Sequence, residues 1–235
     1  MSISVTEKKI KSKIKQGERI IIIENIKYPY FESEKHKKLC RKMNLFYSSV
    51  AERYSYHARN KLPKRIRLSK SQRKLPLTLS MNYTIALCDE KIVSVVLDLT
   101  FSEGKNIKCR RFSQMWNCDG EDILPVSEFI KTDRHSKKKI FSLVAAKAEE
   151  NSENAAFGYF GDFNAKLSKN FDIRTCFAVP KGICFFFNAG ILSPAKYGAN
   201  NFILTYGMLK DVITGLNLYE NEEKCGQNAN NVNNV

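Results

Sequence analysis

The sequence predicts an α+β protein in which an antiparallel β-meander packs against helices, and a terminal β-hairpin and one further strand complete the fold. Three runs of alternating apolar and polar residues fill most of 75–117. An amphipathic helical pattern precedes them, and two more helical patterns separate them from a second group of strands after residue 173. Strands that come in runs, with helices between the runs, are typical of α+β rather than α/β folds.

The first 60 residues predict a basic arm, one strand and one long helix. Residues 1–17 contain few core-forming side chains, which favours a flexible basic arm. Residues 18–30 read as a strand that ends at Pro29, because proline cannot donate to a central ladder. Ser33 is the expected N-cap of a helix reaching about residue 60. Its apolar stripe recurs at spacings of 4, 3, 4 and 4 and consists of Leu39, Met43, Phe46, Val50 and Tyr54.

The meander is the clearest pattern in the chain. Residues 75–87 and 93–101 both alternate with period 2 and are separated by a short turn, as expected for paired strands with one buried face. A third strand is predicted over 107–117. Its apolar residues change parity between Cys109 and Phe112, so a β-bulge is expected near Arg110.

The rest of the chain predicts short helices, a hairpin and a polar tail. A three-residue hairpin loop is expected at 180–182, with Gly182 in the left-handed conformation. A single domain over 18–215 and a disordered, Asn-rich tail over 216–235 complete the expected organisation. The predicted helices span about 126–130, 136–150, 158–170 and 208–216, and the predicted strands span 173–179, 183–188 and 201–206.

The positive charge lies entirely in the first third. The formal net charge is +15, and residues 1–75 hold 21 Lys and Arg against 6 Asp and Glu, which accounts for all of it. Such an asymmetry favours a polyanionic partner, and the alternative is a solvated helix face in a lysine-rich protein. Nucleic-acid binding would be non-specific, because no helix-turn-helix, zinc-finger or RNP pattern is present. The candidate polyanion-binding residues are Lys35, Lys38, Lys42, Lys64, Arg65 and Arg67.

Cysteine usage and hydropathy predict a cytoplasmic protein. The seven cysteines are odd in number and irregular in spacing, which favours reduced, mostly buried thiols over a disulfide framework. The longest apolar run is 20–23, far short of the roughly 20 residues that a membrane span needs. The first 20 residues lack the apolar core of a secretory signal.

Catalytic and cofactor signatures are absent from the sequence. No nucleophile elbow, Walker A loop, dinucleotide fingerprint or zinc-protease motif occurs, so we expect neither an enzyme nor a cofactor or metal site. His36, His57 and His135 are expected at the surface. The candidate ligand-binding residues are Arg110, Arg111 and Trp116, with a core position as the main alternative for the tryptophan.

Three groups of residues resemble one family. The first is Ile26-Lys-Tyr-Pro-Tyr30 before the long helix. The second is Phe112-Ser-Gln-Met-Trp116 followed by Asp119-Gly120, Leu124-Pro125 and Phe129. The third is Phe185-Phe-Phe-Asn188 followed by Ser193-Pro194, Gly198 and Leu204-Thr-Tyr206. In order and spacing they resemble the RsiV-like domain of unknown function, found in the extracellular part of the RsiV anti-sigma factor and in some peptidoglycan deacetylases.

The resemblance covers about residues 18–215 and implies the same α+β fold. Family members often carry Gly-Ala-His where this chain has Lys108-Cys-Arg-Arg111. The best understood members are receptors that bind lysozyme. The resemblance therefore implies a non-enzymatic ligand-binding, protein-binding or sensor module, whose partner is an unidentified protein or anionic ligand. The alternative function is that of a polyanion-binding protein.

Overall fold

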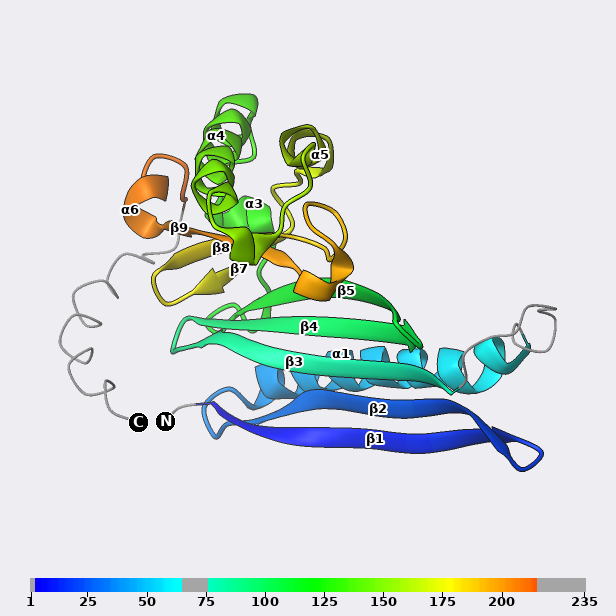
Figure 1. Cartoon of the computed structure of the whole chain (residues 1–235). Coiled ribbons are helices and arrows are strands. Elements are labelled where there is room, and N and C mark those ends of the chain that lie inside the picture. The colour runs from blue at the N-terminus through cyan, green and yellow to red at the C-terminus, as the bar shows by residue number, and fades with distance from the viewer. Residues whose placement is uncertain (1–2, 65–75, 215–235) are drawn as a thin grey trace, which may run out of the picture.

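A computed structural model describes residues 3–64 and 76–214, which form two β-sheets with helices against them (Figure 1). The large sheet has six strands in the order β1 to β6, and the small sheet has three in the order β7 to β9. The large-sheet strands are β1 (Ser4–Gln16), β2 (Arg19–Glu32), β3 (Leu77–Cys88), β4 (Ile92–Glu103), β5 (Asn106–Asn117) and β6 (Asp122–Ile123). The small-sheet strands are β7 (Cys176–Val179), β8 (Gly182–Phe187) and β9 (Asn200–Thr205).

The predicted fold class and the predicted meander are confirmed. β3, β4 and β5 pair antiparallel over nearly their whole lengths. The sheet continues beyond the meander on both sides, because β2 pairs in parallel with β3 and β6 pairs with the end of β5.

The prediction of a flexible arm over residues 1–17 is wrong, because most of that segment is strand β1. β1 pairs antiparallel with β2 from Ser4 opposite Glu32 to Gln16 opposite Arg19. Its apolar residues Ile10 and Ile14 lie opposite Ile26 and Ile22 of β2. Two half-buried isoleucines among many lysines make too weak an alternation to predict a strand.

β2 also continues past Pro29, contrary to the prediction. Its parallel pairing with β3 covers only Ile22 to Ile26, so Pro29 lies in a stretch bonded to β1 alone. A proline is tolerated at such an edge, where its missing N–H breaks no ladder.

The long helix is α1 (Lys37–Tyr56), continued by the π-helical turn η1 (His57–Lys61). It starts later than predicted: the Ser33 hydroxyl does accept a hydrogen bond from a backbone N–H, that of His36 at 3.3 Å, but before the helix begins. The helix buries Leu39, Met43 and Tyr47 in a core shared with β4 and β5.

The predicted bulge in β5 is also wrong, because β4 and β5 pair without a register shift from Ile92 opposite Asn117 to Glu103 opposite Asn106. The parity change has another cause. Both faces of β5 are covered near its end: Trp116 lies in the core under α1, whereas Met115 lies in the core that includes the small sheet.

The C-terminal half largely follows the predicted order of elements. Its main helix, α4, is capped by Asp133, whose side chain accepts from the Ser136 N–H, and it buries Ile140 and Val144 against the small sheet. α5 begins five residues later than predicted, and α6 is shorter. The helical elements are α3 (Val126–Phe129), α4 (Arg134–Ser152), η2 (Ala155–Phe157), α5 (Phe163–Asn170), η3 (Ala195–Tyr197) and α6 (Tyr206–Leu209).

The hairpin between β7 and β8 has a two-residue turn, because Val179 pairs directly with Gly182. Gly182 therefore lies in the strand rather than in the left-handed conformation predicted for it. It is needed for a different reason: a Cβ atom at this position would stand 2.0 Å from the carbonyl oxygen of Leu204.

Six cysteines carry free thiols, and four of them, Cys40, Cys118, Cys176 and Cys184, are buried. Cys225 and the predicted tail over 216–235 lie outside the described residues. Within residues 3–64 and 76–214, no helix is long and apolar enough to cross a membrane.

Candidate functional site

The predicted polyanion-binding lysines do not form one patch. Lys38 is paired with Glu121 at 3.3 Å and Lys42 with Asp122 at 2.7 Å, so the turn between β5 and β6 neutralises this part of α1. Lys35 is exposed beside them. Lys64 is exposed at the other end of the helix, about 40 Å away at 1.5 Å per residue. The remaining two predicted residues, Arg65 and Arg67, lie outside the described part of the chain.

The predicted ligand-binding residues are not brought together either. Arg111 points to the small sheet, where its guanidinium donates to both carboxylate oxygens of Asp98 at 2.8 and 2.7 Å and to Asn201 at 2.7 Å. The hydrogen bonds to Asp98 raise the pKa of Arg111. Its backbone N–H donates to Asn188 at 2.6 Å, so this residue joins the two sheets.

Trp116 and Arg110 lie on the opposite face of β5 from Arg111. Trp116 is 2% exposed, and its indole N–H donates to the Tyr47 hydroxyl at 2.9 Å, so it is a core residue. Arg110 alone of the three is exposed, with its guanidinium 4.7 Å from the centre of the Phe112 ring. The structure therefore does not bring these three residues together in one site.

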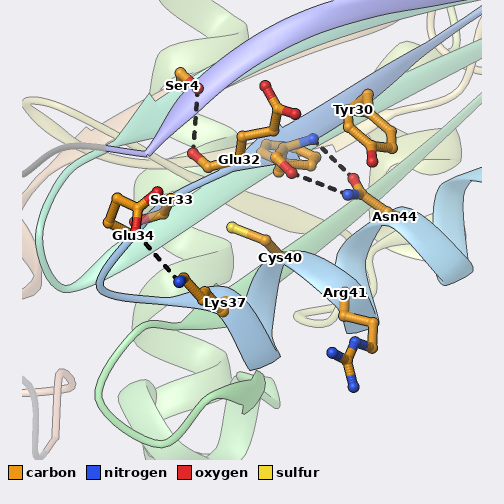
Figure 2. A pocket seen from close by; sticks show the side chains of 10 residues that line it. Ser4, Tyr30, Glu32, Ser33, Glu34, Lys37, Cys40, Arg41 and Asn44 are labelled. Atoms are coloured by element: carbon orange, nitrogen blue, oxygen red, sulfur yellow. Dashed lines mark hydrogen bonds and ion pairs between the residues drawn. The ribbon is translucent and has the colours of Figure 1, made fainter.

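One hollow lies at the start of α1 and has a volume of about 820 Å³. Figure 2 shows Cys40 and Asn44 of the helix pointing toward β2 and Lys37 pointing toward Glu34, whereas the Arg41 side chain points away from the strands. The hollow is wide and polar, and Lys37 is paired with Glu34 at 3.2 Å. Burial raises the pKa of the Cys40 thiol, which keeps the thiol protonated and a poor nucleophile.

A second cavity runs between α1 and strands β4 and β5, and we call it the α1 groove. Its volume is about 500 Å³. Three helix residues and three sheet residues form its apolar walls: Phe46, Val50, Tyr54, Leu97, Leu99 and Phe112. Arg53, His57, Ser113 and Gln114 supply its polar lining, and no Asp or Glu of the described residues lines it.

Local sequence patterns position these walls. Phe46, Val50 and Tyr54 recur every four residues and so share one face of α1. Leu97 pairs directly with Phe112 across β4 and β5, which puts both side chains on the face toward the helix. Phe112 is 40% exposed, so this apolar ring remains accessible in the groove.

The walls are fixed by their own contacts. The Tyr54 hydroxyl donates to the carbonyl of Thr100 at 3.1 Å, and burial raises the pKa of Tyr54 to about 12, so the phenol is neutral at pH 7. The Phe46 ring packs edge-on against Trp116, with ring centres 5.6 Å apart. The groove therefore has a preformed apolar wall that touches the only tryptophan of the chain.

The three histidines differ in environment. The surface position predicted for His36 is wrong: the residue is only 7% exposed, because it stands at the buried start of α1. His57 is half-buried at the α1 groove, and His135 is exposed. Among the described residues, no three His, Cys, Asp or Glu side chains are placed to hold a metal ion together.

The α1 groove was not predicted from the sequence, because its helix residues have the spacing of ordinary core positions. Phe46, Val50 and Tyr54 belong to the stripe that predicts the helix, and the sequence does not show that the sheet beneath leaves part of the stripe uncovered. The one signal in the sequence is Phe112, whose parity departs from that of the preceding apolar residues of β5.

Comparison with solved structures shows which known proteins share this fold. No family model and no curated protein matches the sequence. A crystal structure of a DUF3298 family member from Bacteroides fragilis NCTC 9343 superposes with a TM-score of 0.64 at 11% identity, covering 94% of this chain and 98% of that one. A DUF3298 family protein from Pseudomonas aeruginosa PAO1 gives 0.56 at 12% identity, covering 90% and 95%. At these identities the likeness concerns the fold, and the chain has the α+β fold seen in DUF3298 proteins, a family named for a domain of unknown function.

Proposed function

We propose that the protein is a non-enzymatic binding module whose α1 groove takes the apolar body of a small anionic ligand. The observation that carries the proposal is the groove itself, with an accessible Phe112 ring and a volume of about 500 Å³. Small-molecule sites typically enclose roughly 300–1,000 Å³ and combine apolar walls with a few polar groups.

The charge at the rim favours an anionic ligand. Arg53 lines the α1 groove, and Arg110 stands over the Phe112 ring at its edge. A guanidinium group presents its donors in a planar fork that matches a carboxylate or a similar anion. Because no carboxylate of the described residues lines the groove, an anionic group meets attraction without a competing repulsion.

The polar lining supports binding rather than catalysis. The Ser113 hydroxyl donates to the carbonyl of Cys176 at 2.7 Å, on the side of the small sheet, so it is committed away from His57. The Tyr54 phenol is held neutral by burial and already donates to Thr100. A nucleophile needs a base within hydrogen-bond reach, whereas both of these hydroxyls donate to backbone carbonyls.

The resemblance to RsiV-like domains supports a sensor role, in which ligand binding changes what the domain presents to a protein partner. We place the protein in the cytoplasm, because a compartment that keeps thiols reduced suits the free cysteines.

A fluorescence titration with 1-anilinonaphthalene-8-sulfonate, an aromatic anion, tests the proposal. We expect saturable binding at one site, with a change in Trp116 emission because Phe46 links the tryptophan to the groove. Gln114→Phe, which adds a ring within the groove, should reduce the affinity strongly. Arg53→Gln should weaken binding roughly three- to tenfold through loss of a charged hydrogen-bond donor.

Arg41→Gln is the matched control, because Arg41 is exposed on the same helix but lines the polar hollow instead. It should bind the dye like the parent protein. Equal affinity in all four proteins would mean that the dye binds elsewhere and would refute the groove as the binding site.

A further inference from the structure

The far end of the molecule gathers cations from two distant segments. The tip of the β1–β2 hairpin packs against η1, since Ile14, Ile21 and Ile22 share one apolar cluster with Ala58 and Leu62. Figure 1 shows the hairpin tip and the end of the helix on the same side of the molecule. The exposed cations there are Lys13, Lys15, Arg19, Lys61 and Lys64, which we call the basic end.

The five cations of the basic end form no ion pairs with the described carboxylates, although Glu18 is exposed in the same hairpin turn. Within residues 3–64 and 76–214, no carboxylate lies within 4.0 Å of its five cations. In contrast, Lys38 and Lys42 at the start of α1 are neutralised by Glu121 and Asp122. The five cations of the basic end are therefore not neutralised by ion pairs and can contact the phosphates of a partner.

An exposed aromatic ring precedes Lys61 and Lys64 on the same helical segment. Tyr56 is 60% exposed in the last turn of α1 and lines a hollow of about 420 Å³ together with Arg59 and Asn60. Ile10 of β1 forms the facing wall, and Glu52 lies at the edge. Arg59 is itself held by the buried Glu24 at 3.2 Å, which fixes the turn that carries the hollow.

We propose that the basic end binds single-stranded nucleic acid, with Tyr56 stacking on a base and the five cations binding phosphates. Unpaired bases stack on exposed aromatic side chains, whereas the bases of a duplex are inaccessible to them.

A membrane surface fits this end less well. Membrane-surface binding depends on inserting apolar area as well as on charge. Among the described residues, Tyr56 is the only large hydrophobic side chain exposed at this end.

The cations bind backbone phosphates and give no sequence readout, so binding should be indifferent to base sequence. The proposal uses none of the residues that line the α1 groove and stands independently of it.

The test measures binding of the full chain to a fluorescein-labelled oligo-dT 12-mer by anisotropy over a range of salt concentrations. The double variant Lys61→Gln/Lys64→Gln should reduce the slope of log affinity against log salt by about 1.4, at roughly 0.7 for each phosphate that the variant leaves without a cation. The control Lys38→Gln/Lys42→Gln removes the same net charge from the neutralised end and should leave the slope unchanged.

Tyr56→Leu should lower affinity about tenfold with the same salt slope, and Tyr56→Phe should bind like the parent, because only the ring stacks. The side chain is exposed, so neither change should unfold the protein. The proposal is overturned if both double variants lose affinity equally. It is also overturned if Tyr56→Leu binds unchanged, or if vesicles of equal phosphatidylcholine and phosphatidylglycerol bind more tightly than the 12-mer.

Discussion

The side-chain amide of Asn44 in α1 makes the two hydrogen bonds to the backbone of Phe31 in β2 that a neighbouring strand would otherwise make. Its side-chain oxygen accepts from the Phe31 N–H at 2.7 Å, and its amide nitrogen donates to the Phe31 carbonyl at 2.9 Å. The β2–β3 pairing has already ended at Ile26, so these two bonds satisfy the edge of β2 that no strand covers. They fix the start of α1 against the sheet and so help to place the helix that forms one wall of the α1 groove.

Asn44→Ala should therefore lower the free energy of unfolding by about 2–4 kcal/mol, because it leaves two backbone groups of a buried residue without partners. Urea denaturation measures the change. Asn60→Ala is the control, since that exposed amide donates only to the Tyr56 carbonyl on the same helix, and it should cost less than about 1 kcal/mol. Similar losses in the two variants would contradict the role assigned to Asn44.

Gly182→Ala should destabilise the small sheet severely. A methyl group at this position would stand 2.0 Å from the Leu204 carbonyl oxygen, and backbone on the neighbouring strand cannot move aside cheaply. We expect a loss of more than about 3 kcal/mol in unfolding free energy, or no soluble protein. Gly161→Ala meets no atom within 4 Å and should fold like the parent. A soluble Gly182→Ala protein of parental stability would show that β8 and β9 pair differently.

Stability should fall in alkaline solution. Burial raises the pKa of the Cys118 and Cys184 thiols and of the Tyr54 phenol to about 12, and it also raises the pKa of Cys176. Thiols of the unfolded chain lose their protons near pH 9 and phenols near pH 10, while the folded protein keeps its protons to higher pH. Between these values the unfolded state binds fewer protons, so rising pH favours unfolding.

We expect the free energy of unfolding, measured by urea denaturation with reductant, to be roughly 3–6 kcal/mol lower at pH 10.5 than at pH 8. Each buried group contributes up to about 1.4 kcal/mol per pH unit. Cys176→Ala should show a smaller loss over the same interval, because one of the titrating groups is gone. Equal stability at the two pH values would mean that these thiols are not buried.

Local patterns predicted the elements whose side chains alternate strongly, and tertiary contacts decided the rest. The β3–β5 meander could be predicted because each strand presents an apolar residue at every second position. β1 could not, since Val5, Ile10 and Ile14 are its only apolar residues among many lysines. The parallel pairing of β2 with β3 joins segments about 50 residues apart, and no local pattern records it.

The candidate sites were less predictable, because they depend on which groups the fold brings together. The pairing of Lys38 with Glu121 removes a cation that the sequence presents as free. The uncovered part of the α1 stripe depends on how far the sheet extends beneath the helix. The exposed Tyr56 also required the structure, because it lies only two residues beyond Tyr54, the last position of the predicted apolar stripe.

The most direct test of the α1 groove is an amide chemical-shift map of ¹⁵N-labelled protein titrated with 1-anilinonaphthalene-8-sulfonate. The amides of residues 50–57 in α1 and η1 and of residues 110–114 in β5 should shift together and saturate with one affinity, while those of β7, β8 and β9 stay unchanged. Shifts that gather around Lys37, Cys40 and Arg41 at the polar hollow, or that never saturate, would contradict the account of the protein as a module that binds ligands in the α1 groove.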